Sequence, residues 1–286
     1  MTSPVETFTF KVSNDPIYLG LVTNKNSRVI AIANQKGGVG KTTTVINLAA
    51  SLALAEHSVL AVDMDPQGNL TSGLGAKGTT TERGTIYTAL TSAQPVTASE
   101  LVVGTMVKDL WLIPADRNLT GAEIELVEFP NREQRLRDFI EPIRHRYDYI
   151  LIDSPPSLGL LTLNALVAAD TVLIPLHCEY FALEGLADLI STLRRVRAAF
   201  NPALDIEGVV LTMFEDRTNL GRQVATDVRD FFKRKVFDTV IPRNIRLGEA
   251  PSHGIPVVIY DAKSRGAEAY TALAQELIGR ERRPNS

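Results

Sequence analysis

The chain has 286 residues, of which 44% are hydrophobic and 22% are charged, and its formal net charge is −3. These values are typical of a soluble globular protein with a sizeable core, and the net charge alone gives no reason to expect nucleic-acid binding. One cysteine, no run of eighteen apolar residues and no basic-then-apolar N-terminus exclude an internal disulfide and predict neither a membrane-spanning helix nor a secretory signal.

Residues 1–27 precede the first predicted core strand and differ in pattern from the rest of the chain. Residues 7–12 alternate between polar and apolar side chains like a short strand, and residues 14–16 and 24–27 are typical of turns. We therefore expect residues 1–27 to be an N-terminal extension of the domain.

The next stretch predicts a phosphate-binding loop. Val29–Ala33 is an apolar, β-branched run typical of a buried strand, residues 34–40 contain three glycines, and helical periodicity begins at Thr42. Glycines let the loop N–H groups turn toward a polyphosphate at the positive end of the helix. Lys41 is then placed to reach the β and γ phosphates, and the Thr42 hydroxyl to ligate Mg²⁺. The residues expected to hold the nucleotide are Gly37, Gly38, Val39, Gly40, Lys41, Thr42 and Thr43.

Two acidic residues follow the next predicted strand, Ser58–Asp63. Asp63 and Asp65 lie at the carboxyl end of this strand, beside the phosphate loop, where carboxylates can support Mg²⁺ and water chemistry. Either aspartate alone could equally be a turn or helix-capping residue.

A third acid ends the apolar strand at 147–153, in the pattern called Walker B. A carboxylate at Asp153 would reach Mg²⁺ through its water shell. A strand-terminal aspartate is common, so the prediction of a metal ligand depends on its pairing with the loop at 36–42.

The remaining elements alternate between strands and helices, which predicts an α/β fold. We expect one domain over residues 28–279, with a mostly parallel twisted sheet and helices on both faces, followed by a polar tail at 280–286. Cys178 follows one of the strands and is expected to be a buried small hydrophobe. The predicted strands are 110–114, 171–176, 206–213 and 236–241, and the predicted helices are 85–90, 119–127, 132–146, 184–200, 223–232 and 267–277.

A second lysine at the loop entrance, Lys36, makes the loop resemble the deviant Walker A motif, K-G-G-x-G-K-[ST], of the ParA/MinD group of P-loop ATPases. Over nearly all of residues 28–279 the chain is similar to chromosomal ParA (Soj-type) partition ATPases. The motifs that carry the resemblance are V-D-M-D-P-Q-G-N (62–69), S-P-P-S-L-G-L-L-T-L-N-A-L (154–166), C-E-Y-F-A-L-E-G-L (178–186), R-T-N-L-G (217–221), I-P-R-N-I-R-L-G-E-A-P-S-H-G (241–254) and Y-D-A-K-S-R-G-A-E-A-Y (260–270).

The resemblance implies roles for individual residues. Lys36 would reach the nucleotide of the opposite subunit and act with Lys41 and Asp65 in catalysis. Asp65 would position the attacking water, while Asp63 would support the magnesium shell. By position in the family, the residues that would hold the adenine are Met213, Pro242 and Asn244.

Two arginines, Arg217 and Arg246, match family positions implicated in DNA contact. They lie in a segment, 194–246, with eleven Lys and Arg against seven Asp and Glu. That count alone fits solvated helix faces equally well. For Arg246, bracing the nucleotide pocket stays open as an alternative.

The resemblance implies an ATPase that binds ATP and Mg²⁺ and, as an ATP-bound sandwich homodimer, binds DNA without sequence preference. A ParB-type partner, contacted through residues 1–27, would stimulate slow hydrolysis and release the dimer. We expect a cytoplasmic, nucleoid-associated protein that partitions a chromosome or plasmid. A ParA-like ATPase that positions a protein cargo remains the alternative.

Other members of the superfamily fit the sequence less well. A MinD-like membrane-associated ATPase needs an amphipathic C-terminal helix, and residues 279–286 have no apolar face. An iron–sulfur reductase needs more cysteines than Cys178. A GTPase would have an N-K-x-D motif after a late strand, whereas the Asn-Lys pair here lies upstream of the loop, at 24–25.

Overall fold

The computed structural model describes residues 27–92, 96–179, 182–215 and 219–281, so the predicted N-terminal extension lies outside it except for Ser27. Within these residues seven strands form one sheet. The strands are β1 (Arg28–Ile32), β2 (Val59–Asp63), β3 (Val103–Gly104), β4 (Leu110–Ile113), β5 (Tyr149–Asp153), β6 (Thr171–His177) and β7 (Asp205–Thr212).

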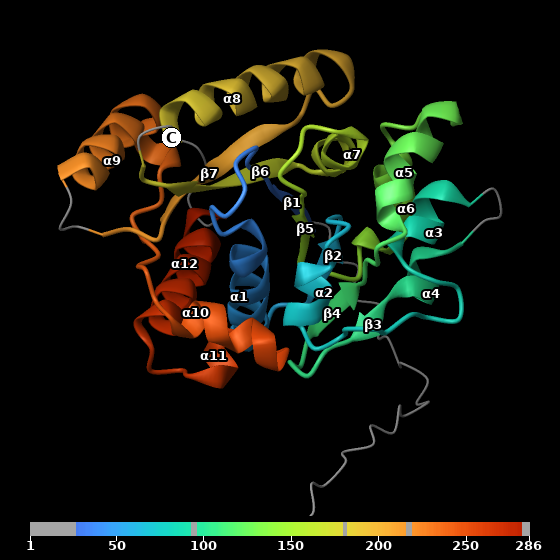
Figure 1. The fold of residues 1–286 in the computed structure, drawn as a ribbon, viewed down its shortest axis with the longest axis horizontal. Helices are drawn as coiled ribbons and strands as arrows, with labels where there is room; N and C mark the ends of the chain where they lie inside the picture. Colours follow the sequence, from blue (N-terminus) through green and yellow to red (C-terminus); the bar gives the residue numbers. More distant parts are fainter. Residues whose placement is uncertain (1–26, 93–95, 180–181, 216–218, 282–286) are drawn as a thin grey trace, which may run out of the picture.

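The strand order is β3-β4-β2-β5-β1-β6-β7 (Figure 1). Every neighbouring pair is parallel except β3 and β4, which are antiparallel. The central strands are apolar, β-branched and buried on both faces, as a covered parallel sheet requires. The predicted fold class, a mostly parallel α/β sheet, is confirmed.

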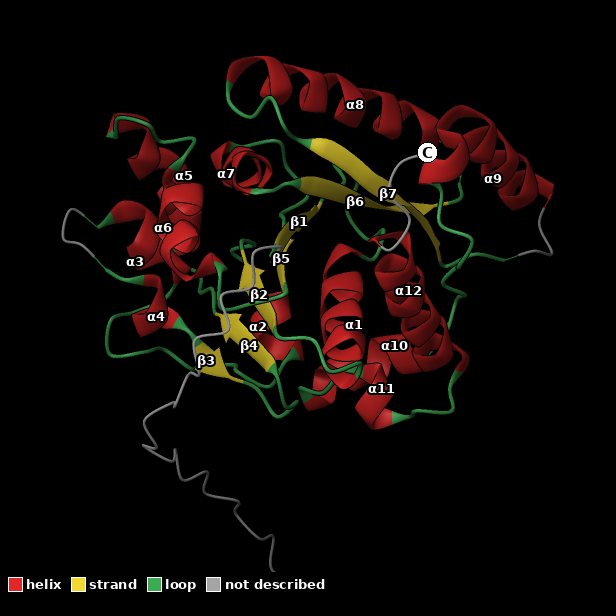
Figure 2. Cartoon of the chain, turned by 180° about the vertical axis from the view of Figure 1, so that it is seen from behind, coloured by secondary structure: helices red, strands yellow, loops and turns green. Residues whose placement is uncertain are grey.

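Helices cover both faces of the sheet (Figures 1 and 2). The α-helices are α1 (Lys41–Leu54), α2 (Asn69–Gly73), α3 (Ile86–Thr91), α4 (Ala98–Leu101), α5 (Leu119–Glu125), α6 (Arg135–Arg144), α7 (Leu160–Ala168), α8 (Ala182–Ala199), α9 (Asn219–Phe232), α10 (Arg246–Glu249), α11 (Val257–Tyr260) and α12 (Arg265–Glu281). Short 3₁₀ turns follow α5, α9 and α10, at Leu126–Glu128, Lys233–Lys235 and Ala250–His253.

Each face of the sheet has its own apolar core. On one face α1, α2, α11 and α12 pack against the strands, with α1 and α12 side by side (Figures 1 and 2). On the other face, helices α3 to α9 bury their apolar side chains against the strands. The chain first adds β2 and β4 on one side of β1. It then returns with β5 between β1 and β2 and adds β6 and β7 on the other side, so the strand order reverses where β1 and β5 lie side by side. In such folds the crevice at the carboxyl ends of these strands is where ligands bind.

The predicted strand at 236–241 is wrong. This segment runs beside β7 but bonds to it only near its two ends, where the Phe237 N–H donates to Val209 O and the Ile241 N–H to Leu211 O. Between them, the N–H groups of Asp238 and Thr239 both donate to the Glu276 carboxylate of α12, at 2.9 Å. A side chain thus takes the donors that a strand would need.

Two further boundaries differ from the sequence-based expectation. The short edge strand β3 was not predicted, because two residues carry no periodicity. Helix α12 runs to Glu281, two residues into the predicted tail. Arg280 is held there by a cation–π contact, with its guanidinium 3.8 Å from the centre of the Phe237 ring.

Candidate functional site

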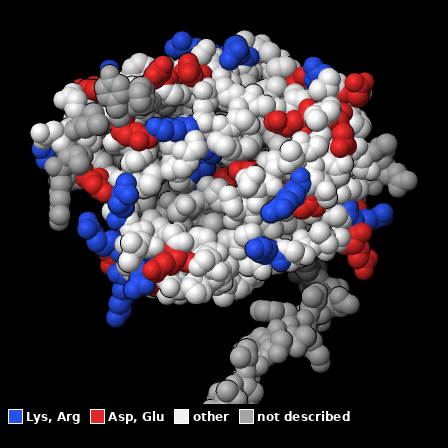
Figure 3. All heavy atoms as spheres, in the orientation of Figure 1, with Lys and Arg blue, Asp and Glu red and all other residues white. Residues whose placement is uncertain are grey.

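The loop between β1 and α1 turns at two glycines with positive φ angles. Gly38 and Gly40 have φ angles of 73° and 89°, which residues with a Cβ atom rarely adopt. The Thr212 hydroxyl, at the end of β7, donates to the Val39 carbonyl oxygen at 2.8 Å and fixes the loop. The molecular surface seen in Figure 3 is hollowed near its middle, where Figure 1 shows this loop. Since the 14-residue α1 starts directly after the loop, its positive N-terminus faces the same space.

Lys41, the first residue of α1, is buried beneath this loop. Its side chain donates from Nζ to the Lys36 carbonyl oxygen at 2.9 Å. Burial lowers the pKa of Lys41, whereas the carboxylates of Asp153 and Asp65 act in the opposite direction. An ammonium group has three donors, so this lysine has the charge and the hydrogen-bonding capacity to hold an anionic ligand.

Asp153, at the end of β5, is fully buried. Within the described residues neither of its carboxylate oxygens accepts a hydrogen bond of ordinary geometry, although the nearby Thr42 side chain lowers its pKa somewhat. Burial first, and then repulsion from Asp63, raise the pKa of Asp153 well above its usual value. Asp63 is its register partner on β2. A buried carboxylate with open acceptor positions, beside a threonine hydroxyl, suits a hydrated Mg²⁺.

Protein side chains alone would not complete a metal site in this crevice. In the part of the chain that the structure describes, no group of three His, Cys, Asp or Glu side chains could hold a metal ion. Mg²⁺ usually takes one or two protein ligands and completes its shell with water and phosphate oxygens. The residues here fit a magnesium ion that arrives with a polyphosphate.

The Asp63 carboxylate is already bonded to the chain that follows β2. It accepts hydrogen bonds from the Thr71 N–H at 2.8 Å, the Thr71 hydroxyl at 2.6 Å and the Asp65 N–H at 3.1 Å. The Thr71 hydroxyl accepts in turn from the Ala115 N–H. Burial raises the pKa of Asp63 to about 6 against these hydrogen bonds. Asp63 therefore anchors the loop at 64–70, and its support of a magnesium shell stays a prediction.

Asp65 combines a turn contact with a position near the loop lysine. Its Oδ1 accepts the Gln67 N–H at 2.9 Å, which closes an Asx turn. Its side chain is nearly buried and its charge acts on Lys41. The carboxylate thus lies in the same crevice as Lys41 and Asp153, and the positioning of water by it stays a prediction.

The three predicted adenine residues lie on two adjacent segments. Met213 follows Thr212, which contacts the phosphate loop, and the next residue donates its N–H to the Ile241 carbonyl oxygen at 3.0 Å. Pro242 and Asn244 follow directly, and all three predicted residues are half-buried. The structure brings them together near the loop, and adenine binding itself remains a prediction.

Of the two arginines matched to DNA contact, Arg217 lies outside the described residues. Arg246 is paired within the chain, since its Nη1 donates to Glu249 at 2.7 Å and its Nε lies 3.3 Å from Asp261. Basic side chains gather at the lower left of the face, where Figure 1 places α10 and α11, with acidic side chains among them (Figure 3). A DNA phosphate would have to compete with two carboxylates for Arg246.

The sequence analysis missed two residues that hold the loop entrance. Asn34 donates from Nδ2 to the Pro175 carbonyl oxygen at 2.8 Å and accepts the Lys36 N–H at 3.0 Å. Glu179 forms an ion pair with the Lys36 side chain. Glu179 belongs to the motif at 178–186, which the sequence analysis identifies without giving this residue a role. The sequence does not show that β1 and β6 are neighbours, and so it does not predict the contact with Lys36.

Comparisons with known proteins agree with this geometry. A family model described as an AAA domain matches residues 27–206. The chain is 57% identical over 254 residues to the chromosome partitioning protein ParA of Myxococcus xanthus, with 89% of each chain covered. It is 54% identical over 250 residues to the sporulation initiation inhibitor protein Soj of Bacillus subtilis, covering 87% of this chain and 98% of Soj.

Two solved structures are similar over most of their length. Cobyrinic acid a,c-diamide synthase from Mycobacterium smegmatis, with a bound ATP analogue and magnesium, has a TM-score of 0.77 and 36% identity, covering 90% of this chain and 96% of that one. The cell division ATPase MinD of Pyrococcus furiosus has a TM-score of 0.72 and 27% identity, covering 88% and 99%. Among the described helices of this chain, none is both long and apolar enough to span a membrane.

Proposed function

Because this chain belongs to the ParA/Soj family of chromosome-partitioning ATPases, we propose that it is a Mg²⁺-dependent ATPase that binds DNA as an ATP-bound dimer. The observation that carries the proposal is the meeting of Lys41 and Asp153 at the N-terminus of α1. A buried lysine with a lowered pKa and a buried carboxylate with a raised pKa are costly to keep in a crevice without a ligand that uses both charges.

The residues of the site have separate proposed roles in phosphoryl transfer. The loop N–H groups and Lys41 would hold the polyphosphate, and Thr42 and Asp153 would hold the hydrated metal. Bound Mg²⁺ would neutralise charge on the transferring phosphoryl group. Asp65 would orient the attacking water. Its carboxylate is already fixed by the hydrogen bond from the Gln67 N–H, and hydrolysis would depend on this orientation. The ATP analogue and magnesium bound to the cobyrinic acid a,c-diamide synthase support this assignment.

Lys36 is proposed to act on the nucleotide of a second subunit. Lys41 already serves the phosphates within the chain, so a second lysine at the loop entrance needs a different partner. Across a sandwich interface Lys36 would neutralise phosphate charge that otherwise repels between subunits.

Dimerisation would double the number of arginines that face one duplex. Phosphate contacts by Arg246, and by Arg217 outside the described residues, would give affinity that is independent of sequence and sensitive to salt. The ion pairs of Arg246 with Glu249 and Asp261 keep its guanidinium oriented before it meets a phosphate.

A ParB-type protein is the proposed partner that stimulates hydrolysis and releases the dimer from the nucleoid. We propose that this partner contacts residues 1–27, of which the structure describes only Ser27. The alternative, a protein cargo positioned on the nucleoid, shares every residue of the ATPase site. A neighbouring ParB-like gene with centromere-like repeats would distinguish the two.

The experiment compares three variants and one control. We expect Lys41→Ala to abolish ATP binding by calorimetry, because the phosphates lose their buried counter-charge. Lys36→Ala should bind ATP yet stay monomeric in gel filtration and retain no DNA. Arg246→Gln should dimerise with ATP and lose DNA. Lys108→Ala removes a lysine that is 93% exposed and should change none of these.

Each result tests a separate part of the proposal. Unchanged ATP affinity in Lys41→Ala would overturn the phosphate-loop assignment. Normal ATP-dependent dimers of Lys36→Ala would overturn the sandwich mechanism for this chain. Unchanged DNA retention by Arg246→Gln would move the DNA-binding surface away from α10.

A further inference from the structure

The side chain of Lys36 has a partner within its own subunit. Its Nζ forms an ion pair with Oε1 of Glu179, and each of the two side chains is 37% exposed. Lys36 follows β1 and Glu179 follows β6, and these strands are parallel neighbours in the sheet. Their carboxyl ends therefore lie at the same edge, next to the phosphate loop.

The backbone around Lys36 is held from two sides. Its N–H donates to the Asn34 side chain, which is itself bonded to the Pro175 carbonyl oxygen of β6. Its carbonyl oxygen accepts the Lys41 ammonium at 2.9 Å. With the backbone fixed in this way, a change of partner by Lys36 needs movement of its side chain only.

Glu179 is itself oriented by its neighbours. Its N–H donates to the His177 carbonyl oxygen, and its carbonyl oxygen accepts the Ala182 N–H at the start of α8, both at 2.9 Å. The His177 Nδ1 lies 3.5 Å from Oε1 of Glu179. The hydrogen bond from Lys36 is the main cause that lowers the pKa of Glu179, and the charges of His177 and Lys36 act in the same direction.

The ion pair is half-exposed, and pairs of this kind contribute little to folding. It can open at low cost, and a phosphate with more than one negative charge would bind the ammonium more strongly than one carboxylate does. The contact is therefore strong enough to orient Lys36 and weak enough to be replaced.

We propose that Glu179 is a positioning residue that holds Lys36 within its own subunit until a nucleotide phosphate on a second subunit replaces it. This inference rests on the proposed function of Lys36 across the dimer interface. Glu179 then sets the threshold for ATP-dependent dimerisation, because each dimer must open two such ion pairs, one in each subunit.

The first measurement tests the ion pair without any dimer. The full-length protein, free of nucleotide, is pulsed with an amine-acylating reagent and labelling at each lysine is read by mass spectrometry. Glu179→Gln should raise labelling of Lys36 about two- to fivefold, as expected for loss of a half-exposed ion pair. Labelling of the exposed Lys108 should not change. The control Glu184→Gln removes an exposed acid of α8 and should leave Lys36 as in the wild type.

The second measurement follows dimerisation by sedimentation with a slowly hydrolysed ATP analogue and Mg²⁺. Glu179→Gln should lower the dimer dissociation constant about two- to fivefold relative to the wild type and to Glu184→Gln. Its thermal unfolding midpoint without nucleotide should be unchanged, which separates this role from a structural one.

The outcomes distinguish the inference from the proposed function beneath it. A wild-type chain that stays monomeric with the analogue would refute the proposed function, and the role of Glu179 with it. If the wild type dimerises and Glu179→Gln dimerises equally well or less well, the role of Glu179 is refuted alone. Unchanged Lys36 labelling in Glu179→Gln would also refute it, because the ion pair would then not restrain the lysine.

Discussion

The carboxylates at the two ends of the parallel strands differ in their hydrogen-bond partners, most clearly between Asp170 and Asp153. At the edge where the strands begin, Asp148, Asp170 and Glu207 accept hydrogen bonds from neighbouring donors. At the edge where the strands end, Asp63 and Asp65 accept hydrogen bonds from the chain that follows β2, whereas Asp153 accepts none of ordinary geometry within the described residues. Asp148 directly precedes β5 and Asp153 ends it, so the difference between the two edges is one of partners and not of fold.

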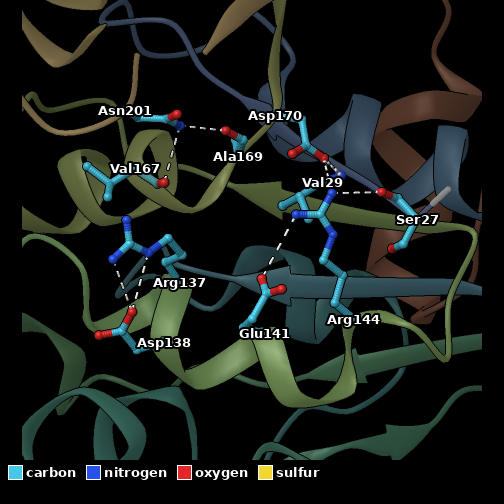
Figure 4. Close-up of polar contacts among 10 residues, drawn as sticks. All are labelled: Ser27, Val29, Arg137, Asp138, Glu141, Arg144, Val167, Ala169, Asp170 and Asn201. Carbon is cyan, nitrogen blue, oxygen red and sulfur yellow. Dashed lines mark hydrogen bonds and ion pairs between the residues drawn. The ribbon is translucent and has the colours of Figure 1, made fainter. Parts of the chain in front are cut away.

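Asp170 illustrates the first edge (Figure 4). Its Oδ2 accepts the Val29 N–H at 2.8 Å and Nη2 of Arg144 at 2.6 Å, and the same Nη2 donates to the Ser27 carbonyl oxygen at 2.8 Å. Nearby, the Asn201 side chain donates to the Ala169 carbonyl oxygen at 2.7 Å. The start of β1 is thus joined to the turn before β6, and the charge at this edge stabilises the fold.

Asp153 illustrates the second edge. It is buried, lies in register beside Asp63 and accepts no hydrogen bond of ordinary geometry within the described residues. Burying a carboxylate without a partner costs free energy. We therefore expect Asp170 to stabilise the fold and Asp153 to lower its stability in favour of ligand binding.

The largest expected effect comes from removing the charge at Asp153. Asp153→Asn should lower Mg²⁺-dependent ATPase activity by about 100-fold or more, because the metal loses a ligand of its shell. The same change should raise the free energy of unfolding of the nucleotide-free chain by about 1–2 kcal/mol, since a neutral amide is cheaper to bury. Steady-state phosphate release and urea unfolding measure the two effects.

A loss of stability in Asp153→Asn would break the comparison. It would mean that the carboxylate is matched in the folded chain after all, as Asp170 is. Unchanged ATPase activity would instead remove Asp153 from the metal site and leave Asp65 as the next candidate.

The next effect tests how far water is excluded at the edge where the strands end. The probe is the thiol of Cys178, which has no proposed part in ATP hydrolysis. Cys178 follows β6, is half-buried and has its pKa raised to about 11 by burial, with Arg229 acting in the opposite direction. At pH 8 its thiolate fraction, and hence its alkylation by iodoacetamide, should be about 100-fold below that of the unfolded chain. The rate should rise about tenfold per pH unit up to pH 10, because the pKa lies above that range. Equal rates in folded and unfolded chains would mean that water reaches this edge freely.

The sequence analysis singled out residues at the edge where the strands end and assigned no role to the acids at the edge where they begin. Glycines at fixed offsets before Lys41, and an apolar strand that ends in Asp153, are local patterns that a single segment carries. The order of the strands was not local information, so the pairing of Lys36 with Glu179 could not be predicted from either motif.

The errors in the fold have the same origin. The segment at 236–241 has the composition of a strand, yet the Glu276 side chain of α12 takes two of its donors. At 236–241 a side chain distant in the sequence thus decides which partners the backbone N–H groups have. Asp63 is expected at the metal; its carboxylate is bonded to Thr71 and the Asp65 N–H, and its support of a magnesium shell stays a prediction.

The smallest expected effect is at the edge where the strands begin, and it has a control on α6, the helix that carries Arg144. Asp170→Ala removes the acceptor shared by the Val29 N–H and Arg144, so the free energy of unfolding should fall by about 1–3 kcal/mol. Asp138→Ala removes one partner of Arg137, which also donates to Gln134, and the Arg137–Asp138 pair on α6 is exposed (Figure 4). Its effect should stay within about 0.5 kcal/mol.

Neither of these two variants should change the ATPase activity per folded molecule, because both residues lie away from the ending edge of the sheet. Urea unfolding gives the free energies, and activity is corrected for the folded fraction. If Asp170→Ala were as mild as Asp138→Ala, the hydrogen bonds to Val29 and Arg144 would add nothing to stability. The starting edge would then owe its stability to the apolar strands alone, and the contrast with Asp153 would concern only ligand binding.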